Sequence, residues 1–221
     1  MATVAILPIK SFRDAKQRLE PSLEPAPRRL LAEAMFADVL VALRRSRSID
    51  RIVVVSTDHR AQSIAGAYGA SLLDEDDRGH NYAAARGIRL AVDQRADRVL
   101  LVPGDCPALD PAQVDELVAR PIEAPSALIV PDRHGTGTNA LLLTPPDVLA
   151  PSFGPGSCER HLAGAGSAGL NHETVQVPTL ALDIDTAEDL EQLRSMLAGT
   201  HGGAAHTRGM LRRLARGSDS C

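Results

Sequence analysis

Short apolar runs alternate with longer segments of helical periodicity along most of this chain, and no other feature constrains the fold as strongly. Strands separated by helices are typical of a mostly parallel sheet with helices on its faces. We therefore predict a single-domain α/β fold. The expected strands are 3–7, 51–55, 71–73, 99–102, 127–130, 140–143, 175–177 and 180–184. The expected helices cover 27–45, 58–67, 81–94, 111–118, a short stretch beginning near 158, and 187–197.

Size and charge exclude several classes of protein. The chain has 221 residues, with 24 Lys and Arg against 28 Asp and Glu, so its net charge is −4. Such a mildly acidic, mixed composition argues against a nucleic acid or a membrane surface as the partner. The sequence shows neither a signal-peptide core nor an apolar stretch approaching ~20 residues. We therefore expect a cytoplasmic protein.

The end of the chain differs in composition from the rest. Residues 198–221 are rich in Gly and carry four Arg against one Asp. Segments of this kind often lack a packed core of their own. We expect one domain over 1–197 and a flexible basic tail over 198–221.

Three aspartates are the strongest candidates for a metal site. Asp183 and Asp185 flank Ile184 in an expected strand, where the period of two places both carboxylates on one face. Asp105 follows another expected strand in the segment PGDCP, at the sheet edge where ligands bind in open α/β folds. Carboxylate oxygens suit Mg²⁺. The alternative is that Asp185 only caps the next helix and Asp183 is solvated.

A basic loop follows the first expected strand. Lys10, Arg13, Lys16 and Arg18 lie within nine residues, at the same sheet edge as Asp105. A phosphate ligand bound with a metal needs both signs of charge at one place. Taken alone, the loop would be an ordinary solvated one; its coincidence with the acids favours a phosphate site.

Other candidate groups are weaker. His134 in the Gly-rich loop is interpreted as a hydrogen-bonding loop residue, and Cys106 as a packing residue because no base is placed to activate it. Cys106, Cys158 and Cys221 form neither a disulfide framework nor a zinc motif. The chain has no P-loop pattern and no dinucleotide-binding glycine pattern where such folds require one.

The motifs LPIKSFRDAKQRL, PGDCPAL, DRHGTGTNALL, FGPGS and LDIDTAEDL occur in this order along residues 1 to about 197. With them the chain resembles the phospholactate guanylyltransferase family, whose fold is similar to that of nucleotide-diphospho-sugar transferases (GT-A-like). The family joins GMP from GTP to 2-phospho-L-lactate, phosphoenolpyruvate or 3-phospho-D-glycerate, in the biosynthesis of the deazaflavin coenzyme factor-420.

The resemblance implies a role for each matching residue. Asp105, Asp183 and Asp185 would bind one or two Mg²⁺ ions, and Lys10 and Lys16 would hold the GTP phosphates. The phospho-acid would lie against Thr138, Gly154 and Ser157, where two hydroxyls and a close backbone approach suit an anion. Asn81, whose amide can pair with a base edge, is the candidate for guanine recognition.

The implied partners are GTP, a small phospho-acid and a downstream transferase carrying the deazaflavin acceptor. Two alternatives stay open: another nucleotidyltransferase of the same fold, such as a molybdopterin-type enzyme, and a non-catalytic nucleotide-binding regulator. The segment PIK in place of a Gly-rich first loop disfavours the former, and the complete set of Asp and Lys residues disfavours the latter. The preferred acid is left open, as is a homodimer.

Overall fold

The protein is built around a seven-stranded sheet with the strand order β3-β2-β1-β4-β6-β5-β7. The structure, a computed structural model, describes residues 1–14, 16–19, 23–74 and 78–218. Strand β6 runs antiparallel to its neighbours β4 and β5, whereas the other neighbouring strands are parallel. The predicted mostly parallel sheet is thus confirmed. The strands are β1 (Thr3–Pro8), β2 (Arg51–Val55), β3 (Ser71–Leu73), β4 (Arg98–Leu101), β5 (Ser126–Pro131), β6 (Thr138–Thr144) and β7 (Asn171–Thr174).

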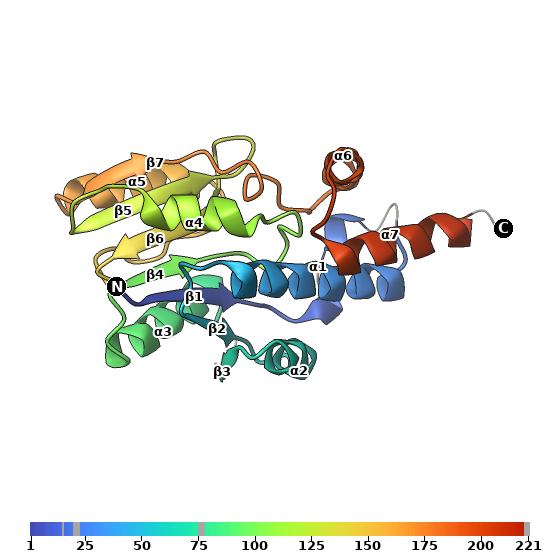
Figure 1. The fold of residues 1–221 in the computed structure, drawn as a ribbon, viewed down its shortest axis with the longest axis horizontal. Helices are drawn as coiled ribbons and strands as arrows, with labels where there is room; N and C mark the ends of the chain where they lie inside the picture. Colours follow the sequence, from blue (N-terminus) through green and yellow to red (C-terminus); the bar gives the residue numbers. More distant parts are fainter. Residues whose placement is uncertain (15, 20–22, 75–77, 219–221) are drawn as a thin grey trace.

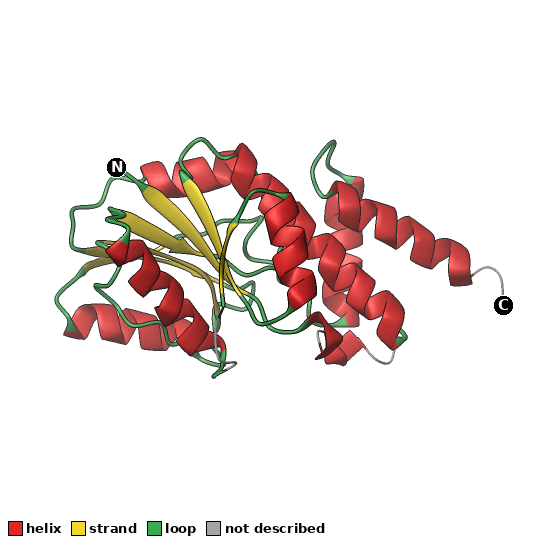
Figure 2. Ribbon diagram, turned by 90° about the horizontal axis from the view of Figure 1, so that it is seen from below, coloured by secondary structure: helices red, strands yellow, loops and turns green. Residues whose placement is uncertain are grey.

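Helices cover both faces of this sheet (Figure 2). The longer ones are α1 (Pro25–Arg45), α2 (His59–Ala67), α3 (His80–Asp93), α4 (Pro111–Ala119), α5 (Ser157–Ser167), α6 (Ala187–Ala198) and α7 (Ala205–Ser218). Two short 3-10 turns, η1 (Phe12–Asp14) and η2 (Gln17–Leu19), lie in the loop after β1. No helix in the described part of the chain is long and apolar enough to cross a membrane.

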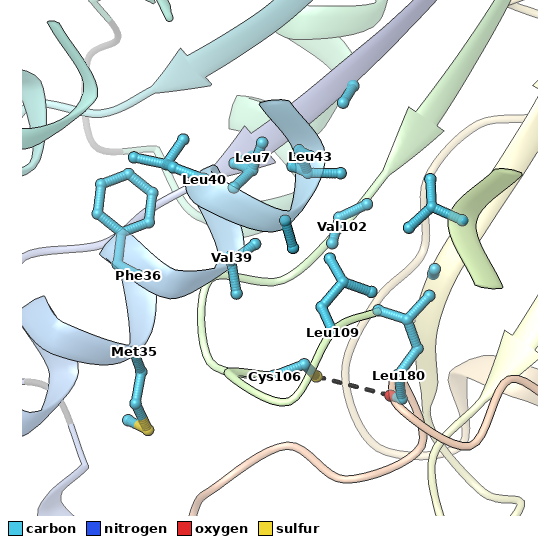
Figure 3. Close-up of a cluster of buried hydrophobic side chains, with 14 of the residues drawn as sticks. Leu7, Met35, Phe36, Val39, Leu40, Leu43, Val102, Cys106, Leu109 and Leu180 are labelled. Atoms are coloured by element: carbon cyan, nitrogen blue, oxygen red, sulfur yellow. Dashed lines mark hydrogen bonds between the residues drawn. The ribbon is translucent and has the colours of Figure 1, made fainter. Parts of the chain in front are cut away.

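The core consists of two apolar layers, one on each face of the sheet. In β1, Ala5 and Leu7 belong to the layer that α1, α4 and α6 cover, while Val4 and Ile6 belong to the layer under α3 and α5. Every residue of β1 is buried, in keeping with a sequence that is apolar throughout after Thr3. Figure 3 shows Cys106 within the first layer, where its thiol donates to the Leu180 carbonyl at 3.5 Å. Its predicted role as a packing residue is confirmed.

The last strand differs from the prediction. Strand β7 is Asn171–Thr174, and neither 175–177 nor 180–184 is a strand. β7 is a polar, largely exposed edge strand parallel to β5, so it lacks the apolar run that identifies buried strands. Segment 180–184 resembles a strand in sequence because it contains Leu180, Leu182 and Ile184. These side chains are buried in the core, but the backbone that carries them is a loop.

The segment after residue 198 also corrects a prediction. Helix α7 packs against α1 and then extends outward to the C-terminus (Figure 1), so 205–218 is not the flexible tail expected from composition. The buried carboxylate of Asp38 on α1 accepts hydrogen bonds from the backbone N–H groups of His206 at 3.0 Å and Thr207 at 2.7 Å. These are among the first amides of α7, which have no partner within the helix. The anchor lies more than 160 residues away in sequence, so composition gave no sign of it.

Candidate active site

A cleft of about 580 Å³ opens at the carboxyl ends of β1 and β4. Its walls are the chain from Pro8 to Phe12, the start of α3 at Gly79 and His80, and Pro103 to Asp105. Lys10, Lys16 and Asp105 therefore line one cavity, as the sheet-edge argument predicts. The loop on the first wall is held by Asp58, which caps α2 and also accepts from the Phe12 N–H at 2.8 Å. Although partial burial opposes ionisation, these backbone donors lower the pKa of Asp58.

Lys16 lies between two of the predicted metal ligands. Its ammonium donates to the carboxylate of Asp105 and to Asp185 Oδ1, the latter at 2.9 Å, and its side chain is only 7% exposed. Burial alone would lower the pKa of this lysine, but the attraction of Asp105 and Asp185 outweighs it and the pKa is raised. The backbone at Lys16 is left-handed, with φ of +59°, a costly conformation for a residue with a side chain. Lys10, by contrast, is exposed on the cleft wall.

Asp183 and Asp185 lie in the extended loop between β7 and α6 rather than in a strand ladder. They still project to the same side, because Leu182 and Ile184 alternate with them and are buried. The predicted pairing of the two carboxylates is therefore right, while its predicted cause is wrong. The loop meets Asp105 through the backbone, since the Ile184 N–H donates to the Asp105 carbonyl at 3.2 Å.

Two polar side chains hold this loop: Asn139, which sequence reasoning did not single out, and Asp189, which the sequence predicts only as part of the cap of the last helix. Asn139 Nδ2 donates to the Leu180 carbonyl at 2.7 Å and to Asp183 Oδ1 at 3.2 Å. Asp189 Oδ2 accepts from the backbone N–H groups of Asp185 and Thr186, at 3.0 and 2.7 Å. The other oxygen of Asp189 is 2.7 Å from the guanidinium of Arg133. The capping box of α6 and an ion pair thus fix the acidic loop.

The chemistry of the acidic side chains fits a divalent cation. Burial raises the pKa of Asp183, and the nearby charges of Asp105 and Asp185 raise it further. Carboxylates that disfavour one another's charge in this way are stabilised by a cation between them. Within the described ranges no three acidic, His or Cys side chains already form a metal cage, and Lys16 supplies the positive charge.

The predicted acid-binding residues come together at the start of β6 and of α5. The Thr138 N–H donates to Ser157 Oγ at 2.8 Å, and both residues are buried. Asn139 is an extra residue in β6, because Val130 pairs with Ala140 while Pro131 pairs with Thr138. This β-bulge shifts the alternation of side chains, so that Thr138 meets α5 while Asn139 meets the acidic loop. Neither Thr138 nor Ser157 lines the cleft itself.

The loop before α5 is clamped by Arg160. Its guanidinium donates to the carbonyls of Ser152 at 2.8 Å and Pro155 at 2.5 Å. Gly154 has φ of +114°, which L side chains rarely adopt, so glycine is required there for backbone reasons. The close backbone approach predicted at Gly154 is compatible with this conformation and stays a prediction.

Asn81, predicted to hydrogen-bond to the edge of guanine, is hydrogen-bonded within the protein instead. Its amide accepts from the Phe153 N–H at 2.7 Å and donates to the Phe153 carbonyl at 3.2 Å. The Phe153 ring packs edge-on against His80, which lines the cleft. In this structure Asn81 therefore joins the start of α3 to the loop before α5, and its amide is already engaged. Its role toward guanine stays a prediction.

His134 is an exposed loop residue, as expected. Its backbone N–H donates to Asp132 Oδ1 at 3.1 Å, and its ring accepts from Arg133. Asp132 organises the loop further by accepting from the Thr136 and Gly137 N–H groups. The Gly-Thr segment is thus an ordered turn between β5 and β6.

Comparison with known proteins decides the family. The model of the family described as "Guanylyl transferase CofC like" matches residues 3–218. The chain belongs to this family. A phosphoenolpyruvate guanylyltransferase from Conexibacter woesei is 52% identical over 218 residues, covering 98% of both chains. A 2-phospho-L-lactate guanylyltransferase from Methanothermobacter thermautotrophicus is 34% identical and covers 99% of this chain and 96% of its own.

Solved structures give the same fold for this CofC-like guanylyltransferase. A crystal structure from Desulfovibrio desulfuricans described as a "putative nucleotide-diphospho-sugar transferase" superposes with a TM-score of 0.78 at 18% identity, covering 98% of both chains. A nucleotidyl transferase from Methanothermobacter thermautotrophicus gives 0.64 at 20% identity, over 90% of this chain and 99% of its own. The predicted nucleotidyltransferase fold is confirmed. The family match extends through α7 to residue 218, beyond the boundary at 197 that the motifs gave.

Proposed function

We propose that this protein transfers GMP from GTP to a three-carbon phospho-acid, with phosphoenolpyruvate as the substrate. The observation that carries the proposal is the contact of Lys16 with Asp105 and Asp185 beside the cleft, in a member of a guanylyltransferase family. Asp183 is near enough to these two carboxylates for their charges to raise its pKa. The name of the relative that is 52% identical over nearly its whole length favours phosphoenolpyruvate among the three acids.

The reaction is an in-line displacement at phosphorus. A phosphate oxygen of the acid attacks the α-phosphorus of GTP, a new P–O–P bond forms, and the bond to the β-phosphate breaks to release pyrophosphate. The attacking phosphate is already ionised at neutral pH, so no general base is needed. Catalysis then consists of positioning and of neutralising charge.

Each part of the site has a place in this scheme. Asp105, Asp183 and Asp185 would hold Mg²⁺, which neutralises charge on the reacting phosphates when bound. Lys10 and Lys16, from the loop after β1, would pair with the remaining phosphate oxygens. Thr138 and Ser157 would donate hydrogen bonds to the acid. The product would pass to a transferase carrying a deazaflavin acceptor, in the biosynthesis of factor-420.

The test is pyrophosphate release from GTP and Mg²⁺ with phosphoenolpyruvate, 2-phospholactate and 3-phosphoglycerate offered separately, and with ATP and CTP as control nucleotides. The downstream transferase with its acceptor serves as a trap for a labile product. Release with GTP and phosphoenolpyruvate is expected. Silence with all three acids, from a folded protein that binds GTP, would overturn the proposal and favour a non-catalytic regulator.

Variants test the role of the acids. Asp105→Asn and Asp183→Asn should abolish turnover while the fold persists. Asp147→Asn is the matched control, because Asp147 is exposed in the loop after β6 and does not line the cleft. A variant of Asp105 or Asp183 that retains a tenth of the rate would have lost only about 1.4 kcal/mol of transition-state stabilisation. That result would remove the residue from the proposed metal site.

A further inference from the structure

His161 is a buried histidine on α5 whose two ring nitrogens both have partners. Nε2 lies 2.9 Å from the backbone nitrogen of Ser152, and Nδ1 lies 2.9 Å from Thr138 Oγ1. A backbone N–H only donates, so Nε2 must be the acceptor and carry no proton. The proton of the neutral ring therefore lies on Nδ1, which donates to the Thr138 hydroxyl.

This tautomer determines what the Thr138 hydroxyl can do. Because Oγ1 accepts from His161, the hydroxyl hydrogen points elsewhere, and no acceptor for it is found among the described residues. The Ser157 hydroxyl has the same hydrogen-bonding state, since its Oγ accepts from the Thr138 N–H. Two neighbouring hydroxyls are thus left with a hydrogen to donate. Carboxylate and phosphate oxygens, which only accept, are complementary to this pair.

We infer that His161 is a positioning residue that orients the Thr138 hydroxyl as a donor to the phospho-acid. This inference deepens the proposed function and rests on it. His161 also accepts from the backbone of Ser152, so the same ring connects the start of β6 to the loop before α5. The residue acts through Thr138 and need not touch the substrate.

The surroundings of His161 keep the ring neutral. The residue is 1% exposed, and burial, with the nearby charge of Arg160, lowers its pKa to about 4. A doubly protonated ring would direct a second N–H at the Ser152 N–H and lose that hydrogen bond. The Phe153 ring also packs edge-on against the His161 ring, with centroids 5.2 Å apart.

Two isosteric variants separate the two hydrogen bonds. In His161→Asn the amide nitrogen takes a position close to Nδ1 and keeps the donation to Thr138. In His161→Gln the terminal oxygen takes a position close to Nε2 and keeps the acceptor for Ser152. We expect His161→Gln to raise KM for phosphoenolpyruvate about 5- to 10-fold, the effect of one misdirected hydrogen bond. KM for GTP should change less than about twofold, and His161→Asn should restore most of the acid affinity.

A double-variant cycle shows whether the effect passes through Thr138. Thr138→Val removes the hydroxyl, so adding His161→Gln to it should raise KM for the acid no further. Additive increases in KM for the acid in the double variant would overturn the inference. Equal increases in KM for GTP and for the acid would also overturn it, as would equal KM values for the acid in His161→Asn and His161→Gln. Thermal unfolding checks that each variant is folded.

Failure of the proposed function is distinguishable from failure of this inference. Wild-type protein that releases no pyrophosphate with any acid overturns the function. The variants can then still be compared through calorimetric binding of phosphoenolpyruvate, where the same order, Asn variant tighter than Gln variant, is expected. Wild-type protein that neither turns over nor binds phosphoenolpyruvate overturns both.

Discussion

Lys16 occupies the position in which a cation would contact Asp105 and Asp185, and its removal should therefore strengthen metal binding in the absence of nucleotide. The lysine donates to both carboxylates and is nearly buried. A divalent ion that binds the same carboxylates must either displace this ammonium or bind beside it against electrostatic repulsion. The perturbation is Lys16→Met, which keeps the apolar stem and removes the charge.

The size of the effect follows from the distances. Two unit charges about 4 Å apart interact by about 1 kcal/mol in water, and by more at a partly buried site. A divalent ion doubles that figure to about 2 kcal/mol, or roughly thirtyfold in affinity. In the wild-type protein the flexible Lys16 side chain can move its ammonium away from a bound metal, which reduces the repulsion. We therefore expect Lys16→Met to tighten metal binding by less than this upper figure, but at least about tenfold.

The assay is a titration with Mn²⁺ followed by electron paramagnetic resonance of the free ion, without GTP or acid. Lys10→Met is the matched control, because Lys10 lines the same cleft but, in the part of the chain that the structure describes, contacts neither Asp105 nor Asp185. The Mn²⁺ affinity of Lys10→Met should differ from that of the wild-type protein by less than about threefold. Unchanged Mn²⁺ affinity in Lys16→Met, or equal gains in both variants, would refute the reasoning. Either result would mean that Lys16 serves only the phosphates.

Three further predictions concern stability. The pKa of His161 is about 4 in the folded protein against its usual 6.5, so its contribution is complete above pH 6.5 and is lost as the pH falls toward 4. Wild-type protein should therefore lose about 1–2 kcal/mol more unfolding free energy than His161→Gln between pH 7 and pH 5, measured in urea; parallel curves would contradict this. Asp58→Ala removes the cap of α2 and the anchor of Phe12 and should cost about 1–2 kcal/mol in the same assay, whereas a neutral result would mean that the cap contributes nothing. Asp38→Ala should release α7, so that limited proteolysis first cuts near 199–204; resistance equal to that of wild type would show that Asp38 is not the anchor.

The central sheet was predictable because burial on both faces leaves a clear pattern. The runs in β1, β2 and β4 are continuous and apolar, and each lies in the core as expected. Strand β7 and helix α7 were not predictable in the same way. The first is a polar edge strand, and the second depends on a buried aspartate far away in the sequence.

The candidate site was predictable where it depends on sheet topology. Lys10, Lys16 and Asp105 follow β1 and β4, and parallel neighbouring strands bring their carboxyl ends together. The residues that hold these groups were not predictable. Asn139 donates to a backbone carbonyl of a loop without regular structure, and Asp189 accepts from a backbone N–H of the same loop. Backbone partners of this kind carry no sequence signal.

One irregularity in the sheet links the two halves of the site. If β6 alternated regularly through residues 138–140, Thr138 would lie on the same face as Ala140, away from α5. The bulge turns Thr138 toward His161 and leaves Asn139 facing Asp183. Two consecutive residues therefore connect the proposed acid pocket on one side of the sheet to the proposed metal loop on the other. Deleting Asn139 would restore the regular register with Thr138 still opposite Pro131, so the contact of Thr138 with α5 should persist while the contact with Asp183 is lost.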